Sequence, residues 1–323
     1  MSKKYKFIDL FAGIGGIRIA FERHNTECVF SSEWDKYCQK TYFENFGDMP
    51  YGDITKVDAK NIPYHDILTG GFPCQPFSTI GKRQGFDHDT QGTLFFDIER
   101  IIKEKKPAAF LLENVKGLKN HDNGKTYDII KRTLKNKLGY WVDDKVLNSV
   151  KFGVPQQRKR IYFVGFRKDL SDNKNFNFTW PSESNAEVGI GQFVENNPKG
   201  YKISKHLQES YLFKKNDGRP QVIDQTSDFA VKTLVATYHK IQRLTGTFVK
   251  DGETGLRLLS ESECKAIMGF PKKYKFPVSR TQMYKQMGNS VAIPVVQSIA
   301  ESMIKTLKKV NHESTWDRNV DNK

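Results

Sequence analysis

The chain has 323 residues, 37% hydrophobic and 28% charged, a composition that allows a sizeable core in one large domain or two. No apolar run approaches the roughly 18 residues that span a bilayer, and the N-terminus runs directly into a strand-like segment. We therefore expect a cytoplasmic protein with no membrane partner and no signal peptide. The net charge of +15 favours nucleic acid as the partner, although charge alone leaves open a merely basic protein.

Short apolar runs alternate with amphipathic stretches over the first 170 residues. Strands are predicted at 6–11, 28–32, 66–69, 108–112, 145–149 and 160–166, and helices at 15–24, 36–46, 94–105 and 125–138. This alternation predicts an α/β fold, a Rossmann-like domain over residues 1–170 with a mostly parallel sheet and helices on both faces.

The residue pattern changes from about residue 171, where Asn, Pro, Ser and Gly form loop-like clusters. Residues 171–276 predict a smaller, irregular, β-rich domain with short strands at 231–238 and 246–250. In residues 277–310 a C-terminal helix is predicted at 291–307. Its apolar stripe should pack back on the first domain. The polar tail, 311–323, is expected to fray.

A glycine-containing turn, Phe11-Ala12-Gly13-Ile14-Gly15-Gly16, follows the first predicted strand. Such a turn lets backbone approach a ligand closely, but it lacks the full G-x-G-x-x-G spacing. An adenosine ligand other than a dinucleotide is therefore favoured. Glu33 ends the second strand, where an acid accepts from ribose hydroxyls. Trp34 could cover an adenine ring, and Asp53 could take its amino group.

Cys74 lies between Pro73 and Gln75 after the third apolar run, and Glu113-Asn114 closes the next. A thiol and a carboxylic acid beside an amide suit covalent attack on a ring that must be held through nitrogen. The carboxyl ends of successive parallel strands meet at one sheet edge, so these groups should share one site. The four cysteines form no C-x-x-C pair, so no metal and no disulfide framework is expected.

Six motifs in order resemble the DNA (cytosine-5) methyltransferases of bacterial restriction-modification systems. They are residues 7–16, Pro73-Cys74-Gln75, Glu113-Asn114-Val115, Gln156-Gln157-Arg158-Lys159-Arg160, residues 257–271 and residues 284–291. The likeness covers nearly the whole chain and is nearest to small monomeric enzymes that accompany restriction endonucleases. The stretch between Phe166 and Arg257 matches the family's variable target recognition domain.

The resemblance implies S-adenosylmethionine as cofactor and double-stranded DNA as substrate, with the target cytosine flipped out of the helix. The implied cofactor contacts are Phe11, Gly13, Gly15, Gly16, Glu33, Trp34, Asp53, Ile54, Pro73, Leu94, Asn289 and Ser290. The implied catalytic residues are the nucleophile Cys74, Glu113 at the cytosine amino group and N3, Asn114 orienting backbone, Arg160 near O2, and Arg158 supporting the thiol's surroundings or a phosphate.

DNA contacts are expected in two places. Ser78, Lys82 and Arg83 belong to a closing lid beside Cys74, over residues 78–92. In the variable domain Thr233-Leu234 resembles the family's Thr-Leu pair, and Lys240, Gln242 and Arg243 follow it. Arg and Gln suit base edges, but the cations could equally hold phosphate.

Three alternatives stay open at this point. An RNA cytosine-5 methyltransferase of the tRNA-acting branch shares these motifs, but the long variable segment favours DNA. A catalytically silent DNA-binding regulator would not need Cys74 and Glu113. A nucleotide-linked oxidoreductase would use the glycine turn but gives no reason for Pro73-Cys74-Gln75.

Overall fold

The computed structural model describes residues 4–73, 94–171 and 176–313. Its centre is a six-stranded sheet in the order β2-β1-β3-β4-β6-β5. The strands are β1 (Tyr5–Leu10), β2 (Thr26–Ser32), β3 (Ile67–Gly71), β4 (Ala109–Val115), β5 (Tyr140–Asn148) and β6 (Lys159–Arg167). Strands β2, β1, β3 and β4 pair in parallel, whereas β6 runs antiparallel to both of its neighbours. The predicted mostly parallel sheet is confirmed.

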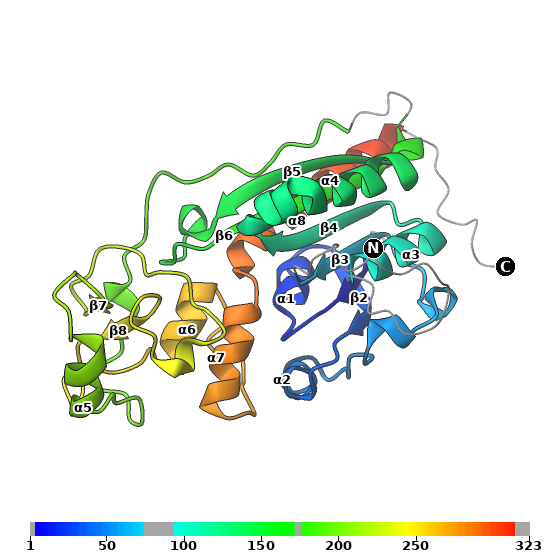
Figure 1. Ribbon diagram of the computed structural model, residues 1–323. Coiled ribbons are helices and arrows are strands. Elements are labelled where there is room, and N and C mark those ends of the chain that lie inside the picture. The colour runs from blue at the N-terminus through cyan, green and yellow to red at the C-terminus, as the bar shows by residue number, and fades with distance from the viewer. Residues whose placement is uncertain (1–3, 74–93, 172–175, 314–323) are drawn as a thin grey trace.

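Helices cover both faces of this sheet, because successive residues of a strand point to opposite faces. On one face Phe7 and Leu111 pack with α1 (Gly16–Glu22) and α8 (Ile293–Glu313). On the other face Ile8 and Phe110 pack with α3 (Phe95–Lys105) and α4 (Lys125–Arg132). Figure 1 shows these layers, with α2 (Lys36–Phe46) near the β2 edge.

A smaller region lies to the left of the sheet in Figure 1. It holds α5 (Lys205–Leu207), β7 (Gln221–Ile223), β8 (Thr247–Val249) and α6 (Glu261–Met268), with α7 (Arg280–Asn289) between it and the sheet. Strands β7 and β8 pair in parallel over three residues each. The region is irregular as expected but contains less strand than expected. The Trp180 side chain donates to that of Asp143 of β5 at 2.8 Å, so the chain still contacts the sheet well beyond residue 171.

Several predicted elements change in the structure. The predicted strand at 231–238 is wrong: only Val231 forms a bridge, to Gln156, and a 3-10 turn follows at Tyr238–Lys240. The backbone of Leu234 bonds instead to side chains, those of Gln156 and Arg158. Sequence reasoning also missed α6 and α7, although Ser260 and Glu263 form a capping box whose S-x-x-E pattern is visible in the chain.

The C-terminal helix packs on the first domain, as the apolar stripe predicted. Val295, Ile299, Met303 and Leu307 are buried in the core that α8 shares with α1. The helix extends to Glu313 and so overlaps the expected tail, of which residues 314–323 lie outside the described part.

Candidate active site

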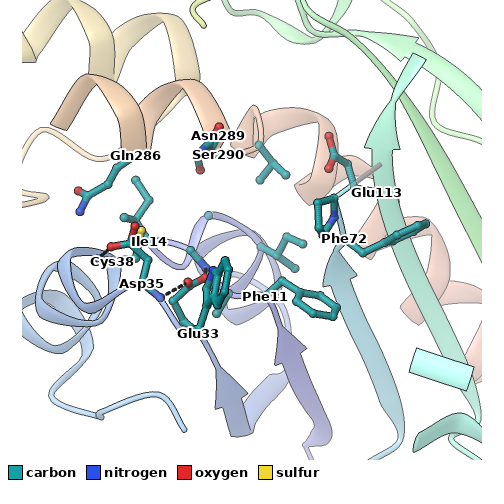
Figure 2. Close-up of a pocket in the computed structure, with 18 of the residues that line it drawn as sticks. Phe11, Ile14, Glu33, Asp35, Cys38, Phe72, Glu113, Gln286, Asn289 and Ser290 are labelled. Atoms are coloured by element: carbon teal, nitrogen blue, oxygen red, sulfur yellow. Dashed lines mark hydrogen bonds between the residues drawn. The ribbon is translucent and has the colours of Figure 1, made fainter. Parts of the chain in front are cut away.

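A cavity of about 650 Å³ opens at the carboxyl ends of β1 to β4, where parallel sheets bind ligands. Figure 2 shows side chains reaching it from the strand ends on one side and from α7 on the other. Its walls include nearly every predicted catalytic or cofactor residue that the structure describes: Phe11, Gly13, Gly16, Glu33, Trp34, Asp53, Ile54, Pro73, Leu94, Glu113, Asn114, Arg158, Arg160, Asn289 and Ser290. Among those described, Gly15 is the exception.

The glycine turn brings backbone to the cavity wall. Phe11, Gly13 and Gly15 all have positive φ angles, of 56°, 56° and 76°, a conformation that favours glycine. A Cβ on Gly15 would lie 2.3 Å from the Phe46 ring, so this glycine lets α1 pack against α2 rather than contacting a ligand. A Cβ on Gly16 would lie 2.7 Å from Oγ of Ser290, so Gly16 lets α7's end approach the turn.

Glu33 organises the cavity floor. Its Oε2 accepts from the Gly13 backbone N–H and its Oε1 from that of Asp35, both at 2.8 Å. Burial raises the pKa of this carboxyl, and the two backbone N–H donors oppose the rise. Each oxygen keeps a further lone pair, so the carboxylate can also accept from a ligand.

Two predicted adenine contacts flank Glu33. The Trp34 side chain is 75% exposed at the cavity rim, free to cover a planar ligand. Asp53 accepts from the N–H and the hydroxyl of Thr55, at 3.0 and 2.8 Å, and so begins the 3-10 turn that follows it. Both residues line the cavity.

Helix α7 forms the wall of the cavity that faces the strand ends (Figure 2). Lys285 Nζ lies 2.9 Å from the Asp35 carboxylate at the start of α2, and Thr41 donates to Gln286 Oε1 at 3.0 Å. Sequence reasoning missed Asp35, Lys285 and Gln286 as wall residues. Their positions near Trp34 and Asn289 in the chain could have predicted them, since residues that flank a ligand-binding turn often line the same cavity.

Glu113 and Arg160 form an ion pair at the other end of the cavity. Arg160 Nε lies 3.1 Å from Glu113 Oε1, because Val115 of β4 faces Arg160 of β6 in the antiparallel register and Glu113 shares that face. Burial raises the pKa of Glu113, while Arg160 and then Arg158 lower it. Asn114 points the other way and donates to the carbonyl of Phe72 at 2.9 Å, which fixes the chain just before Pro73.

Arg158 does not present its guanidinium for a phosphate. Only 2% of this residue is exposed, and it donates to the carbonyls of Leu234, Gly288 and Ser290. Burial and the neighbouring Arg160 lower its pKa, and Glu113 opposes them. The phosphate contact considered for Arg158 is therefore not supported by its surroundings.

The expected DNA-reading residues differ in availability. Lys240 and Gln242 are exposed. Thr233 donates to the Gln157 carbonyl at 2.6 Å. Arg243 is buried: it pairs with both carboxylate oxygens of Asp217 and donates to the carbonyls of Leu212 and Lys215. This corrects the expectation that Arg243 contacts a base or a phosphate, since its guanidinium donors are already bonded within the smaller region.

Cys74, Ser78, Lys82 and Arg83 lie outside the described residues, as does the rest of the expected lid. Within the described ranges no group of three or more His, Cys, Asp or Glu side chains could hold a metal ion. Among the described helices, none is both long and apolar enough to cross a membrane.

The sheet order and the cavity at its carboxyl edge define an α/β enzyme of the Rossmann-like methyltransferase class. Solved structures agree on the fold: a DNMT2 from Spodoptera frugiperda has a TM-score of 0.74 at 23% identity, covering 94% of this chain and all of the other. The S. pombe Dnmt2 methyltransferase also scores 0.74, at 19% identity, covering 96% of this chain and 100% of its own.

The profile of the C-5 cytosine-specific DNA methylase family matches residues 5–305, and the chain belongs to that family. It is similar to the type II methyltransferase M.MspI of Moraxella sp, 59% identical over 97% of this chain and 73% of the relative. M.BsuFI of Bacillus subtilis is 58% identical over 93% and 72%, and M.HhaI of Haemophilus parahaemolyticus 44% over 91% and 93%. The predicted family, fold class and DNA (cytosine-5)-methyltransferase activity are confirmed. The family uses S-adenosylmethionine.

Proposed function

We propose that this enzyme methylates C5 of a flipped-out cytosine in a short specific duplex sequence, through a covalent bond between Cys74 Sγ and cytosine C6. The observation that carries the proposal is the ion pair of the buried Glu113 with the half-buried Arg160, in the wall of the same cavity as Glu33. A cofactor end and a base end thus share one cavity, and Asn114 ties the base end to the chain that leads into Cys74.

The residues present fit S-adenosylmethionine. Glu33 would accept from the ribose hydroxyls with the lone pairs that Gly13 and Asp35 leave free. Trp34 and Asp53 would hold the adenine. Because Gly16 and Ser290 lie close together in the cavity wall, their backbone would surround the methionine part. When bound, the cofactor supplies a methyl group on a positively charged sulfonium.

The chain's own residues would prepare the ring. The Cys74 thiolate adds to C6, and the electrons that it supplies make C5 nucleophilic. Glu113 would hold the amino group and N3 in a dry site where its interactions are strong, and Arg160 would lie near O2. After methyl transfer to C5, the C5 proton leaves to water and the Sγ–C6 bond breaks, which regenerates the thiolate and the aromatic ring.

Target choice is proposed to reside in residues 171–256, since the sheet edge is occupied by cofactor and cytosine. The exposed Lys240 and Gln242, and Thr233 near them, are the proposed DNA contacts of that segment, and Ser78, Lys82 and Arg83 those of the lid. Because the type II relatives belong to restriction-modification systems, we propose a cognate endonuclease as functional partner. A monomer acting on DNA in a bacterial cytoplasm fits this role.

Labelled methyl transfer to duplex DNA and to tRNA, followed by bisulfite mapping, tests the function. We expect one methylated sequence in DNA and none in tRNA. A duplex with 5-fluorocytosine at the mapped position should trap an adduct on Cys74, because fluorine cannot leave as a proton does. Mapping the adduct to Cys28, Cys38 or Cys264, or activity retained in Cys74→Ser, would refute the covalent assignment.

A further inference from the structure

A short segment of the smaller region, residues 231–236, is fastened to the loop that precedes β6. Val231 N donates to the Pro155 carbonyl at 2.9 Å, and Gln157 N returns a bond to the Val231 carbonyl at 2.8 Å. Leu234 N donates to the Gln156 side chain at 2.8 Å. None of residues 231–236 lines the cofactor cavity. We call this segment the clasp segment.

Arg158 joins the clasp segment to the cavity wall with a single side chain. Its Nη1 donates to the Leu234 carbonyl at 3.1 Å, while its Nη2 donates to the carbonyls of Gly288 at 3.0 Å and Ser290 at 2.5 Å. Gly288, Ser290 and Arg158 itself line the cavity. A guanidinium is a rigid planar fork, so its two ends cannot move independently.

Backbone packing reinforces this junction. A Cβ added to Gly288 would lie 2.2 Å from the Ala236 nitrogen and 2.3 Å from the Val235 carbonyl carbon. The clasp segment therefore rests directly on the turn of α7 that continues into Asn289 and Ser290. That turn cannot shift without shifting the clasp segment, because the two backbones are in direct contact and leave no room for even a Cβ atom between them.

We propose that Arg158 is a positioning residue that couples the clasp segment to the cofactor cavity, so that cofactor binding orders residues 231–236 and DNA bound there tightens the cofactor. Coupling of this kind is reciprocal, since each ligand changes the other's affinity by the same factor. The inference rests on the proposed function for its second half, because the DNA contacts of the neighbouring residues are part of that proposal.

Hydrogen exchange of the wild-type protein tests the first half without DNA. Saturating S-adenosylhomocysteine should slow amide hydrogen exchange roughly several-fold in a peptide covering residues 231–238, although that peptide does not line the cavity. Unchanged exchange there, with protection at residues 11–16 as proof of binding, would overturn the proposal. A methylation failure would leave this result intact and so would count against the proposed function alone.

The variant Arg158→Lys tests the side chain, because a compact ammonium cannot span Leu234 and Ser290 as the fork does. The readout is the factor by which cognate duplex tightens S-adenosylhomocysteine binding. Factors of roughly 5 to 150 are typical of coupled sites, and we expect the factor to fall to about 1 in the variant. A wild-type factor of 1, or a variant that keeps the wild-type factor, contradicts the coupling.

Arg167→Lys is the matched control. Arg167 ends the same strand, donates to the Lys106 carbonyl and pairs with Asp169, far from the clasp segment. This variant should keep the full coupling factor. If Arg158→Lys does not fold, Gly288→Ala replaces it, since the added Cβ pushes on Val235 and Ala236 and should lower the coupling factor without changing the guanidinium itself. The exchange experiment on the wild type decides the question whichever variant is stable.

Discussion

The backbone N–H of Gly13 donates to Oε2 of Glu33 at 2.8 Å, so one carboxylate joins the turn after β1 to the end of β2. The other oxygen, Oε1, accepts from Asp35, which begins α2. Glu33 therefore shapes the cavity floor before any ligand binds. A residue with this double role should be sensitive even to the most conservative replacement.

Glu33→Gln should weaken S-adenosylmethionine binding by about 10- to 100-fold, because one amide N–H₂ must replace an acceptor that faces a backbone N–H. Calorimetry with S-adenosylhomocysteine measures the effect. Glu44→Gln is the control and should bind normally, since Glu44 is exposed on α2, pairs with Lys275 and does not line the cavity. Unchanged affinity in Glu33→Gln would place the ribose elsewhere.

Glu113→Gln should lower kcat by roughly 10²- to 10⁴-fold, since the carboxyl that holds and polarises the cytosine ring is removed. Cofactor affinity should persist, because Glu113 lies at the end of the cavity away from Glu33 (Figure 2). Single-turnover methylation and cofactor titration separate the two effects. Glu104→Gln, exposed on α3, should behave as wild type. An active Glu113→Gln enzyme would argue against the proposed role.

Arg243→Ala should destabilise the smaller region rather than relax specificity at one base pair. The loss should be on the order of 2 kcal/mol, below the ~3–5 of a fully buried pair, because the Asp217 side chain is 42% exposed. Asp217→Ala should also lower the melting temperature. Lys240→Ala should instead keep its melting temperature and, if Lys240 contacts phosphate, lower the salt slope of DNA binding by about one unit. A normally stable Arg243→Ala enzyme with altered preference at one position would restore the base-reading role.

Asp9 should make stability depend on pH. It is fully buried on β1, accepts from Thr69 Oγ1 at 3.1 Å, and burial raises its pKa from 3.8 to about 7; Arg18 lowers the pKa and Glu33 raises it. The folded state then binds more protons than the unfolded state between these values, so stability falls as pH rises from about 4 to 7 and is level above.

Asp9→Asn removes this contribution. Relative to wild type, its free energy of unfolding should rise progressively from pH 5 to pH 7, by on the order of 1.4 kcal/mol per pH unit at most. Its melting temperature relative to wild type should rise with it. Asp128→Asn, an exposed carboxylate on α4, serves as control and should track the wild type. Parallel melting curves for Asp9→Asn and wild type across this range would show that Asp9 stays ionised throughout.

Much of the catalytic domain was determined by local sequence. Apolar runs of strand length separated by amphipathic stretches determined the sheet and its helices, and the positions of Glu33 and Glu113 at strand ends placed them at one edge. These features depend on neighbours in the chain, which the sequence displays directly.

Only the tertiary structure decided what the long polar side chains do. Arg243 finds Asp217, 26 residues away, and Arg158 finds the carbonyls of Leu234 and Ser290, 76 and 132 residues away. The strand predicted at 231–238 is absent for a related reason, since the backbone N–H and carbonyl of Leu234 bond to the side chains of Gln156 and Arg158. A guanidinium satisfies its donors with whichever acceptors the packing brings near it, and no periodicity along the chain records which acceptors those are.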